Sequence, residues 1–184
     1  MGIEERYINH LDAGSGGDMG LEGQGFPAEE VVVNFFNASG FDARFSTATE
    51  DEGTTDIGPK QIIDAVVYYD GKPAMAPQIT TSTIKSFREK KLDELRQRPF
   101  LRLDEMGPSD PAIPKVLIYL KAKDVKAFGE DPDFSRHPEI ALQILNSSII
   151  SLNFDLSKTE NPLEQKAITE LVGMLETEKK KYIH

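Results

Sequence analysis

The segment spanning residues 62–81 carries the polar side chains with the clearest potential for chemistry. Asp64 stands at the start of one expected strand, and Gln78 and Thr80 stand late on the next strand. Antiparallel pairing would bring these two strand ends together, and residues two apart share one face of a strand. Metal-dependent phosphodiesterases need such a geometry, because oxygen ligands must hold Mg²⁺ beside the scissile phosphate while a lysine stabilises the attacking water or the developing charge.

The surrounding sequence predicts alternating helices and strands. In chain order, the patterns predict a helix from Pro27 to about residue 39, strands at 41–49, 62–69 and 74–81, a helix at 83–98, a strand at 115–121, and helices at 138–152 and 162–180. Asp70-Gly71 is a strong hairpin signal between the second and third strands. Pro77 indicates an edge, a bulge or a missing ladder bond in the third strand. Residues 115–121 are almost wholly apolar, which predicts a central strand buried on both faces.

The 184 residues suit one domain better than two. Residues 10–25 include six glycines and little apolar material, so ordering them would lose backbone entropy with little burial in return. We therefore predict a flexible glycine-rich leader over residues 1–26 and a single α/β domain over residues 27–184.

The element order and the polar positions resemble the core of the PD-(D/E)XK nuclease superfamily, which includes restriction enzymes and Holliday-junction resolvases. The resemblance covers about residues 28–98 and implies a restriction-endonuclease-like fold with a central mixed four-stranded sheet flanked by helices. It also implies a Mg²⁺ or Mn²⁺ site for the polar positions. Asp64 takes the place of the metal-binding Asp, Gln78 that of the second acid, Thr80 that of the lysine, and Glu29 or Glu30 that of the helix acid.

This motif is degenerate, because a threonine hydroxyl cannot supply a fixed positive charge. In some members of the superfamily a lysine reaches in from the following helix, and Lys85 is the nearest candidate here. Lys85, Arg88 and Lys91 belong to a basic stretch of that helix that could contact phosphates. A solvated helix face with Glu and Lys neighbours explains the stretch equally well.

The charge distribution limits the partners of this chain. Its net charge is -10, and residues 1–80 hold 14 acidic against 4 basic residues, while the remainder holds 17 of each. Since nucleic-acid binding depends on Lys and Arg, any contact with DNA would have to be local. The acidic stretch at 50–56 lacks EF-hand spacing, so a solvated loop is favoured over a Ca²⁺ site.

Composition also predicts the compartment and excludes several chemistries. The chain contains no cysteine, which excludes disulfides, thiol nucleophiles and thiolate zinc sites. Of the three histidines, His10 lies near the predicted leader and His184 is the last residue, which leaves too few for a three-histidine zinc site or a convincing relay. No apolar stretch is long enough for a membrane span, and the first residues lack a signal-peptide profile, so we expect a cytoplasmic protein without membrane partners.

Two hypotheses follow. The first is a divalent-metal nuclease acting on DNA, with Asp64 and a helix glutamate on the metal, Gln78 assisting and Lys85 stabilising charge. The second is a catalytically inactive scaffold that serves as a structural or protein-interaction module, in which Asp64 caps a turn and Gln78 satisfies backbone groups. An ammonium of Lys85 close to Asp64 and Gln78 would favour the first. The apolar final helices could form a homodimer interface or cover the sheet.

Overall fold

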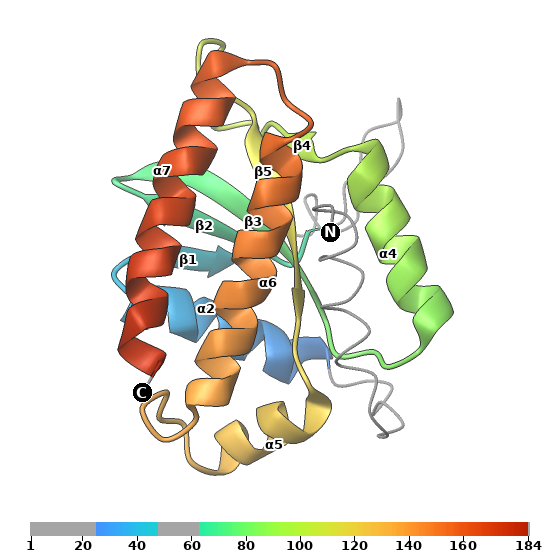
Figure 1. Ribbon diagram of the computed structural model, residues 1–184, viewed down its shortest axis with the longest axis vertical. Helices are drawn as coiled ribbons and strands as arrows, with labels where there is room; N and C mark the ends of the chain where they lie inside the picture. The colour runs from blue at the N-terminus through green and yellow to red at the C-terminus, as the bar shows by residue number, and fades with distance from the viewer. Residues whose placement is uncertain (1–24, 48–62, 184) are drawn as a thin grey trace.

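The computed structural model describes residues 25–47 and 63–183, which form layers of helices around a central sheet (Figure 1). Most of the predicted leader and the acidic stretch at 50–56 lie outside the described residues. The helices are α2 (Gly25–Ala38), α4 (Lys85–Gln97), α5 (Ala122–Glu130), α6 (Pro138–Leu156), α7 (Pro162–Lys179) and the 3-10 turn η1 (Lys180–Tyr182). The strands are β1 (Asp42–Phe45), β2 (Ala65–Tyr69), β3 (Lys72–Thr80), β4 (Phe100–Leu101) and β5 (Ile113–Tyr119).

The sheet is mixed and has the strand order β1-β2-β3-β5-β4. β1, β2 and β3 pair in antiparallel fashion, β5 pairs parallel to β3, and β4 pairs antiparallel to β5. The α/β class and the four predicted strands are confirmed, but the expected count of four strands is wrong. The fifth strand, β4, has two residues, which is too short to produce an alternating pattern.

The hairpin between β2 and β3 follows its turn chemistry. Asp70 and Gly71 both have positive φ, 51° and 72°, as the central residues of a type I′ turn require. Tyr69 pairs with Lys72 across this turn, and a register shift follows between Val67 and Tyr68. The sheet therefore positions Asp64 near the far end of β3, as antiparallel pairing predicts.

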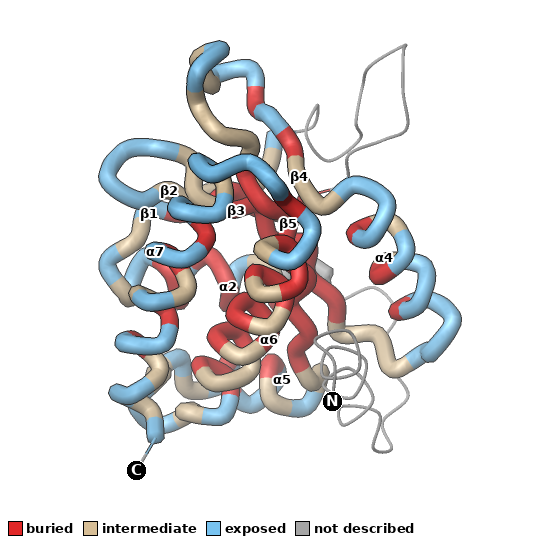
Figure 2. The backbone as a smooth tube through the Cα atoms, turned by 45° about the horizontal axis from the view of Figure 1, so that its top comes forward, coloured by how far each residue is buried: buried red, intermediate tan, exposed pale blue. Residues whose placement is uncertain are grey.

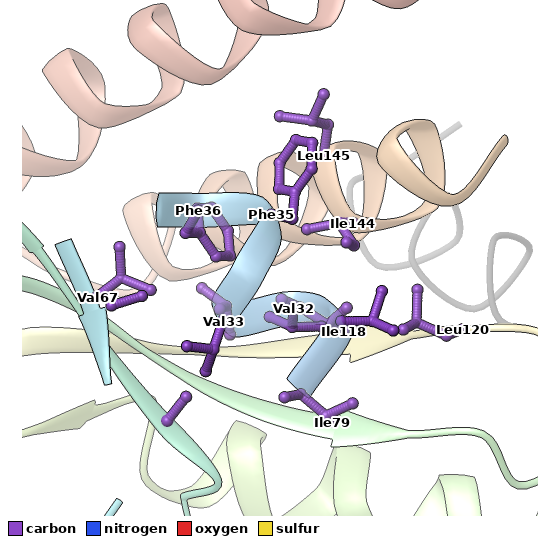
Figure 3. Close-up of a cluster of buried hydrophobic side chains, with 14 of the residues drawn as sticks. Val32, Val33, Phe35, Phe36, Val67, Ile79, Ile118, Leu120, Ile144 and Leu145 are labelled. Carbon is purple, nitrogen blue, oxygen red and sulfur yellow. The ribbon is translucent and has the colours of Figure 1, made fainter. Parts of the chain in front are cut away.

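One face of the sheet is covered by α2 and α6; α5 packs against these two helices, and α7 packs outside α6. Figure 3 shows the side chains of α2 meeting those of the strands and of α6; the labelled residues are Val32, Val33, Phe35, Phe36, Val67, Ile79, Ile118, Leu120, Ile144 and Leu145. Of the two final helices, α6 covers the sheet and α7 packs on α6. We call this surface of the sheet the apolar face.

The opposite face of the sheet is covered by α4, and we call it the α4 face. Leu92 and Leu95 of α4 pack on Leu117 and Tyr119 of β5 in a cluster much smaller than the core of the apolar face. The outward surface of α4 is exposed, whereas β3 and β5 run through the buried middle of the molecule (Figure 2). The prediction that β5 is central and buried on both faces is confirmed.

Helix side chains bind backbone groups of β1 and of the part of β5 that β4 does not cover. Along β5, Gln143, Ser147 and Ser151 of α6 accept hydrogen bonds from the backbone N–H groups of Lys121, Tyr119 and Leu117, at 2.8, 3.3 and 3.2 Å. At β1, the Asn37 side chain of α2 accepts from the N–H of Ala43 and donates to its carbonyl, at 2.8 and 3.2 Å. These bonds satisfy backbone groups that would otherwise offer pairing sites to another strand.

Among the described residues, no helix combines the length and apolarity that a membrane crossing requires.

Candidate functional site

Asp64 lies immediately before β2 and links three strands. Its backbone N–H donates to the carbonyl of Pro77 at 2.9 Å, and its carbonyl accepts from the N–H of Ser46 at 3.0 Å. Its carboxylate oxygen Oδ2 accepts a short hydrogen bond from the backbone N–H of Ile79. The side chain of Asp64 thus takes the role that a backbone carbonyl of a neighbouring strand would play.

Lys91 of α4 binds the other backbone group of the same residue. Its Nζ donates to the carbonyl oxygen of Ile79 at 3.0 Å and lies 5.5 Å from the ring centroid of Phe87. One residue of β3 is therefore bound by a carboxylate at its N–H and by an ammonium at its C=O. We call Asp64, Ile79 and Lys91 the Ile79 clamp.

Gln78 and Thr80 flank Ile79 and lie on the α4 face. They pair with Leu117 and Tyr119 of β5, which pack against α4, whereas the Ile79 side chain belongs to the core of the apolar face. Gln78 is 4 % exposed and Thr80 is 5 % exposed. The Thr80 hydroxyl accepts a hydrogen bond from the N–H of Ser82 at 3.2 Å. In this arrangement a phosphate from solvent does not reach either side chain.

The basic residues of α4 divide between its two sides. Lys85 points to solvent, 75 % exposed, with its Nζ 3.8 Å from a carboxylate oxygen of Glu89. Arg88 is 3 % exposed, and its Cζ lies 5.8 Å from the ring centroid of Tyr119. By the criterion of the sequence analysis, the solvent position of Lys85 favours the non-catalytic hypothesis. The inward lysine is Lys91.

The helical spacing of the basic residues in α4 indicates which of them face the sheet. Arg88, Lys91, Leu92 and Leu95 are related by steps of three and four, so they share one stripe of the helix. Basic residues that fall on the apolar stripe of a helix are positioned to face the core with it. That spacing singles out Lys91 over Lys85 as the lysine that reaches the strands.

The acids of α2 do not complete a metal site with Asp64. Glu30 is exposed and Glu29 is half-buried on α2. Within residues 25–47 and 63–183, no three His, Asp or Glu side chains gather closely enough to share a metal ion. Mg²⁺ prefers several oxygen ligands in near-octahedral geometry. At the Ile79 clamp the described residues offer one carboxylate and one strand carbonyl, which are fewer oxygen ligands than this ion prefers.

Two buried titratable side chains, Asp155 of α6 and Lys115 of β5, were not anticipated from the sequence. Asp155 of α6 is 1 % exposed, and neither of its carboxylate oxygens has a hydrogen-bond partner among the described residues. Burial raises the pKa of Asp155 well above its usual value, an effect that the charge of Lys115 partly opposes. Burial likewise lowers the pKa of Lys115. Asp155 continues the four-residue spacing of Gln143, Ser147 and Ser151, and this polar stripe in an apolar helix was the available signal.

The described residues thus form an α/β protein with a five-stranded mixed sheet, in which the charged side chains of Asp64 and Lys91 bind the backbone of β3. Comparisons with known protein families, curated proteins and solved structures found no match to this chain.

Proposed function

We propose that this chain is a non-catalytic scaffold with a PD-(D/E)XK-like core that serves as a protein-interaction module. The observation that carries the proposal is the Ile79 clamp. The carboxylate of Asp64 and the ammonium of Lys91 are bound to the backbone of Ile79, whereas a nuclease needs such groups for metal and phosphate.

The burial of the neighbouring polar residues supports the same proposal. Gln78 and Thr80 face α4 and are almost inaccessible to solvent. Catalytic groups must lie within hydrogen-bond reach of the substrate, directly or through one water. A hydrogen-bonded and covered motif is instead suited to holding β2, β3 and α4 together.

We expect partners to bind to side chains on the surface of this scaffold and not to the backbone of a sheet edge. Docking by strand addition needs unpaired backbone groups along a sheet edge. Asn37 occupies those groups at Ala43 of the edge strand β1, and two serines of α6 occupy the N–H groups of Leu117 and Tyr119 where β4 does not cover β5. We therefore expect partners to bind to helices or to cavities between helices and loops.

The test compares stability and cleavage in the parent chain and in Asp64→Ala. If Asp64 is structural, its removal leaves the Ile79 N–H without its partner and lowers the free energy of unfolding by about 1–3 kcal/mol. Urea denaturation measures this loss. Asp42→Ala, which removes an exposed strand acid, is the matched control and should change stability by less than about 0.5 kcal/mol.

The same proteins are then incubated with plasmid, branched and single-stranded DNA in Mg²⁺ or Mn²⁺. The scaffold proposal expects no cleavage and no heat of metal binding by titration calorimetry. Metal-dependent cleavage that Asp64→Ala abolishes would overturn it.

One contact favours a second candidate, a Mg²⁺- or Mn²⁺-dependent nuclease in which Lys91 replaces the missing motif lysine. Its Nζ lies 3.0 Å from the carbonyl of the residue between Gln78 and Thr80. This candidate expects cleavage that Lys91→Met abolishes and Lys85→Met retains. The proposed role of Lys85 in charge stabilisation would then pass to Lys91.

A further inference from the structure

A cavity of about 600 Å³ lies at the opposite end of β2 from Asp64. Its wall is formed by the loop between α2 and β1, the last residue of β2, α7 and η1; the residues are Ser39, Gly40, Phe41, Tyr69, Glu170, Gly173, Met174, Thr177, Glu178 and Lys181. Asp64 and Tyr69 are five residues apart on an extended strand, roughly 16 Å. The cavity is therefore separate from the Ile79 clamp.

The cavity has an apolar wall. The rings of Phe41 and Tyr69 are tilted against each other with centroids 5.8 Å apart, and Tyr69 is 48 % exposed. Phe41 and Met174 are half-buried and pack against the core of the apolar face, which holds them in place. Two aromatic rings and a thioether on a fixed support offer contact to an alkyl chain and to a cation.

The charge lining this cavity is negative. Glu178 forms an ion pair with Lys181, so these two charges offset each other. Glu170 is paired with Lys166 at 3.9 Å, but both side chains are more than 60 % exposed and such surface pairs are weak. Glu170 can therefore exchange this partner for another cation. The net charge of -10 of the whole chain attracts a basic partner over longer distances.

Gly173 lies in the interior of α7 and opens onto the cavity. Glycine destabilises a helix interior relative to alanine, so its presence calls for a reason. Among the described residues outside its own helix backbone, no heavy atom lies within 4 Å of the place where its Cβ would stand. Close packing does not require this glycine, whereas any larger side chain there would take up space in the cavity.

We propose that this cavity binds an arginine side chain of a basic partner protein. The guanidinium group can stack on an aromatic ring while it binds a carboxylate with its fork of N–H groups. Here Tyr69 and Phe41 supply the rings and Glu170 supplies the carboxylate, while the alkyl stem lies along Met174 and Gly173. The inference rests on the proposed function, because it names the recognition chemistry of the interaction module.

The test is an NMR titration of the full ¹⁵N-labelled chain with N-acetyl-arginine amide. N-acetyl-citrulline amide is the matched ligand, because it has a similar length and a planar head but no charge. For one side chain we expect affinity in the millimolar range. Arginine should shift the amide signals of Gly40, Phe41, Tyr69, Gly173 and Met174 in a saturable way, and citrulline should bind more weakly. Absence of saturable shifts, or equal binding of both ligands, would overturn the proposal.

Two variants locate the binding site. Gly173→Leu fills the cavity and should abolish the shifts, whereas Gly129→Leu places the same side chain on an equally open helix position outside the cavity and should retain them. Glu170→Gln, which keeps the shape of the wall, should weaken arginine binding by about two- to fivefold. The proposed site is contradicted if a folded Gly173→Leu variant still binds arginine, or if Glu170→Gln leaves the affinity for arginine unchanged.

Failure of this inference is distinguishable from failure of the proposed function. Asp64-dependent DNA cleavage together with arginine binding would overturn the scaffold proposal and leave the cavity as a binding site. An absence of cleavage together with an absence of arginine-specific shifts would overturn the cavity proposal alone.

Discussion

The two faces of the sheet are built by different means. On the apolar face, α2, α5 and α6 bury one continuous cluster of hydrophobic side chains against the strands. On the α4 face, small apolar clusters alternate with buried polar and charged residues; these are Gln78, Thr80, Arg88 and Lys115. The first face is therefore stabilised by apolar burial, whereas the second also buries polar groups, and each of those that lacks a partner is destabilising.

Truncating one leucine on each face should produce the largest effects and test this contrast directly. Leu145 of α6 is fully buried in the core of the apolar face, and Leu95 of α4 is 3 % exposed in the small cluster. We expect Leu145→Ala to lower the free energy of unfolding by about 4–5 kcal/mol and Leu95→Ala by about 2–3 kcal/mol. Urea denaturation gives both values, and equal losses would break the comparison.

The buried Asp155 should make stability depend on pH. Because its pKa is raised in the folded state, the folded chain holds the proton more tightly, and stability falls as pH rises from the unfolded pKa near 4 through the folded pKa. Asp155→Asn removes this dependence. Between pH 4 and 8 the stability of the variant relative to the parent should therefore rise by more than about 1 kcal/mol.

Denaturation of both proteins at several pH values measures this change, and parallel pH profiles would show that Asp155 does not titrate in the folded state.

Lys115 affects the free energy of unfolding in a different pH range. Because burial lowers the pKa of Lys115, the contribution of this residue to the free energy of unfolding grows as pH rises from the folded pKa toward the unfolded pKa of about 10.4.

The smallest expected effect compares two lysines of α4. Lys91→Met removes the hydrogen bond to the carbonyl of Ile79 and should lower the free energy of unfolding by about 1–2 kcal/mol. Lys85→Met alters a solvated side chain in a weak ion pair and should change the free energy of unfolding by less than about 0.5 kcal/mol. If the two variants are equally stable, the Ile79 clamp does not hold α4 on the sheet.

The sequence predicted the regular elements well and the site only in part. The ends of β2 and β3 met where antiparallel pairing through the Asp70-Gly71 turn required. The contact of Lys91 with β3 was not predicted, because Lys85 is nearer to β3 along the chain. Lys91 reaches the strand because it shares a helical stripe with Leu92 and Leu95. The residues of α5 and β4 were missed because their patterns are short.

The sequence by itself determined the α/β class, the hairpin and the burial of β5, because these depend on local turn chemistry and on the period of apolar residues. Tertiary structure alone decided what the polar residues do. Asp64 and Lys91 are 27 positions apart along the chain, and their partnership with the backbone of Ile79 exists only after β2, β3 and α4 have packed together. A local pattern specifies that a residue is polar, whereas its partner is specified by the fold.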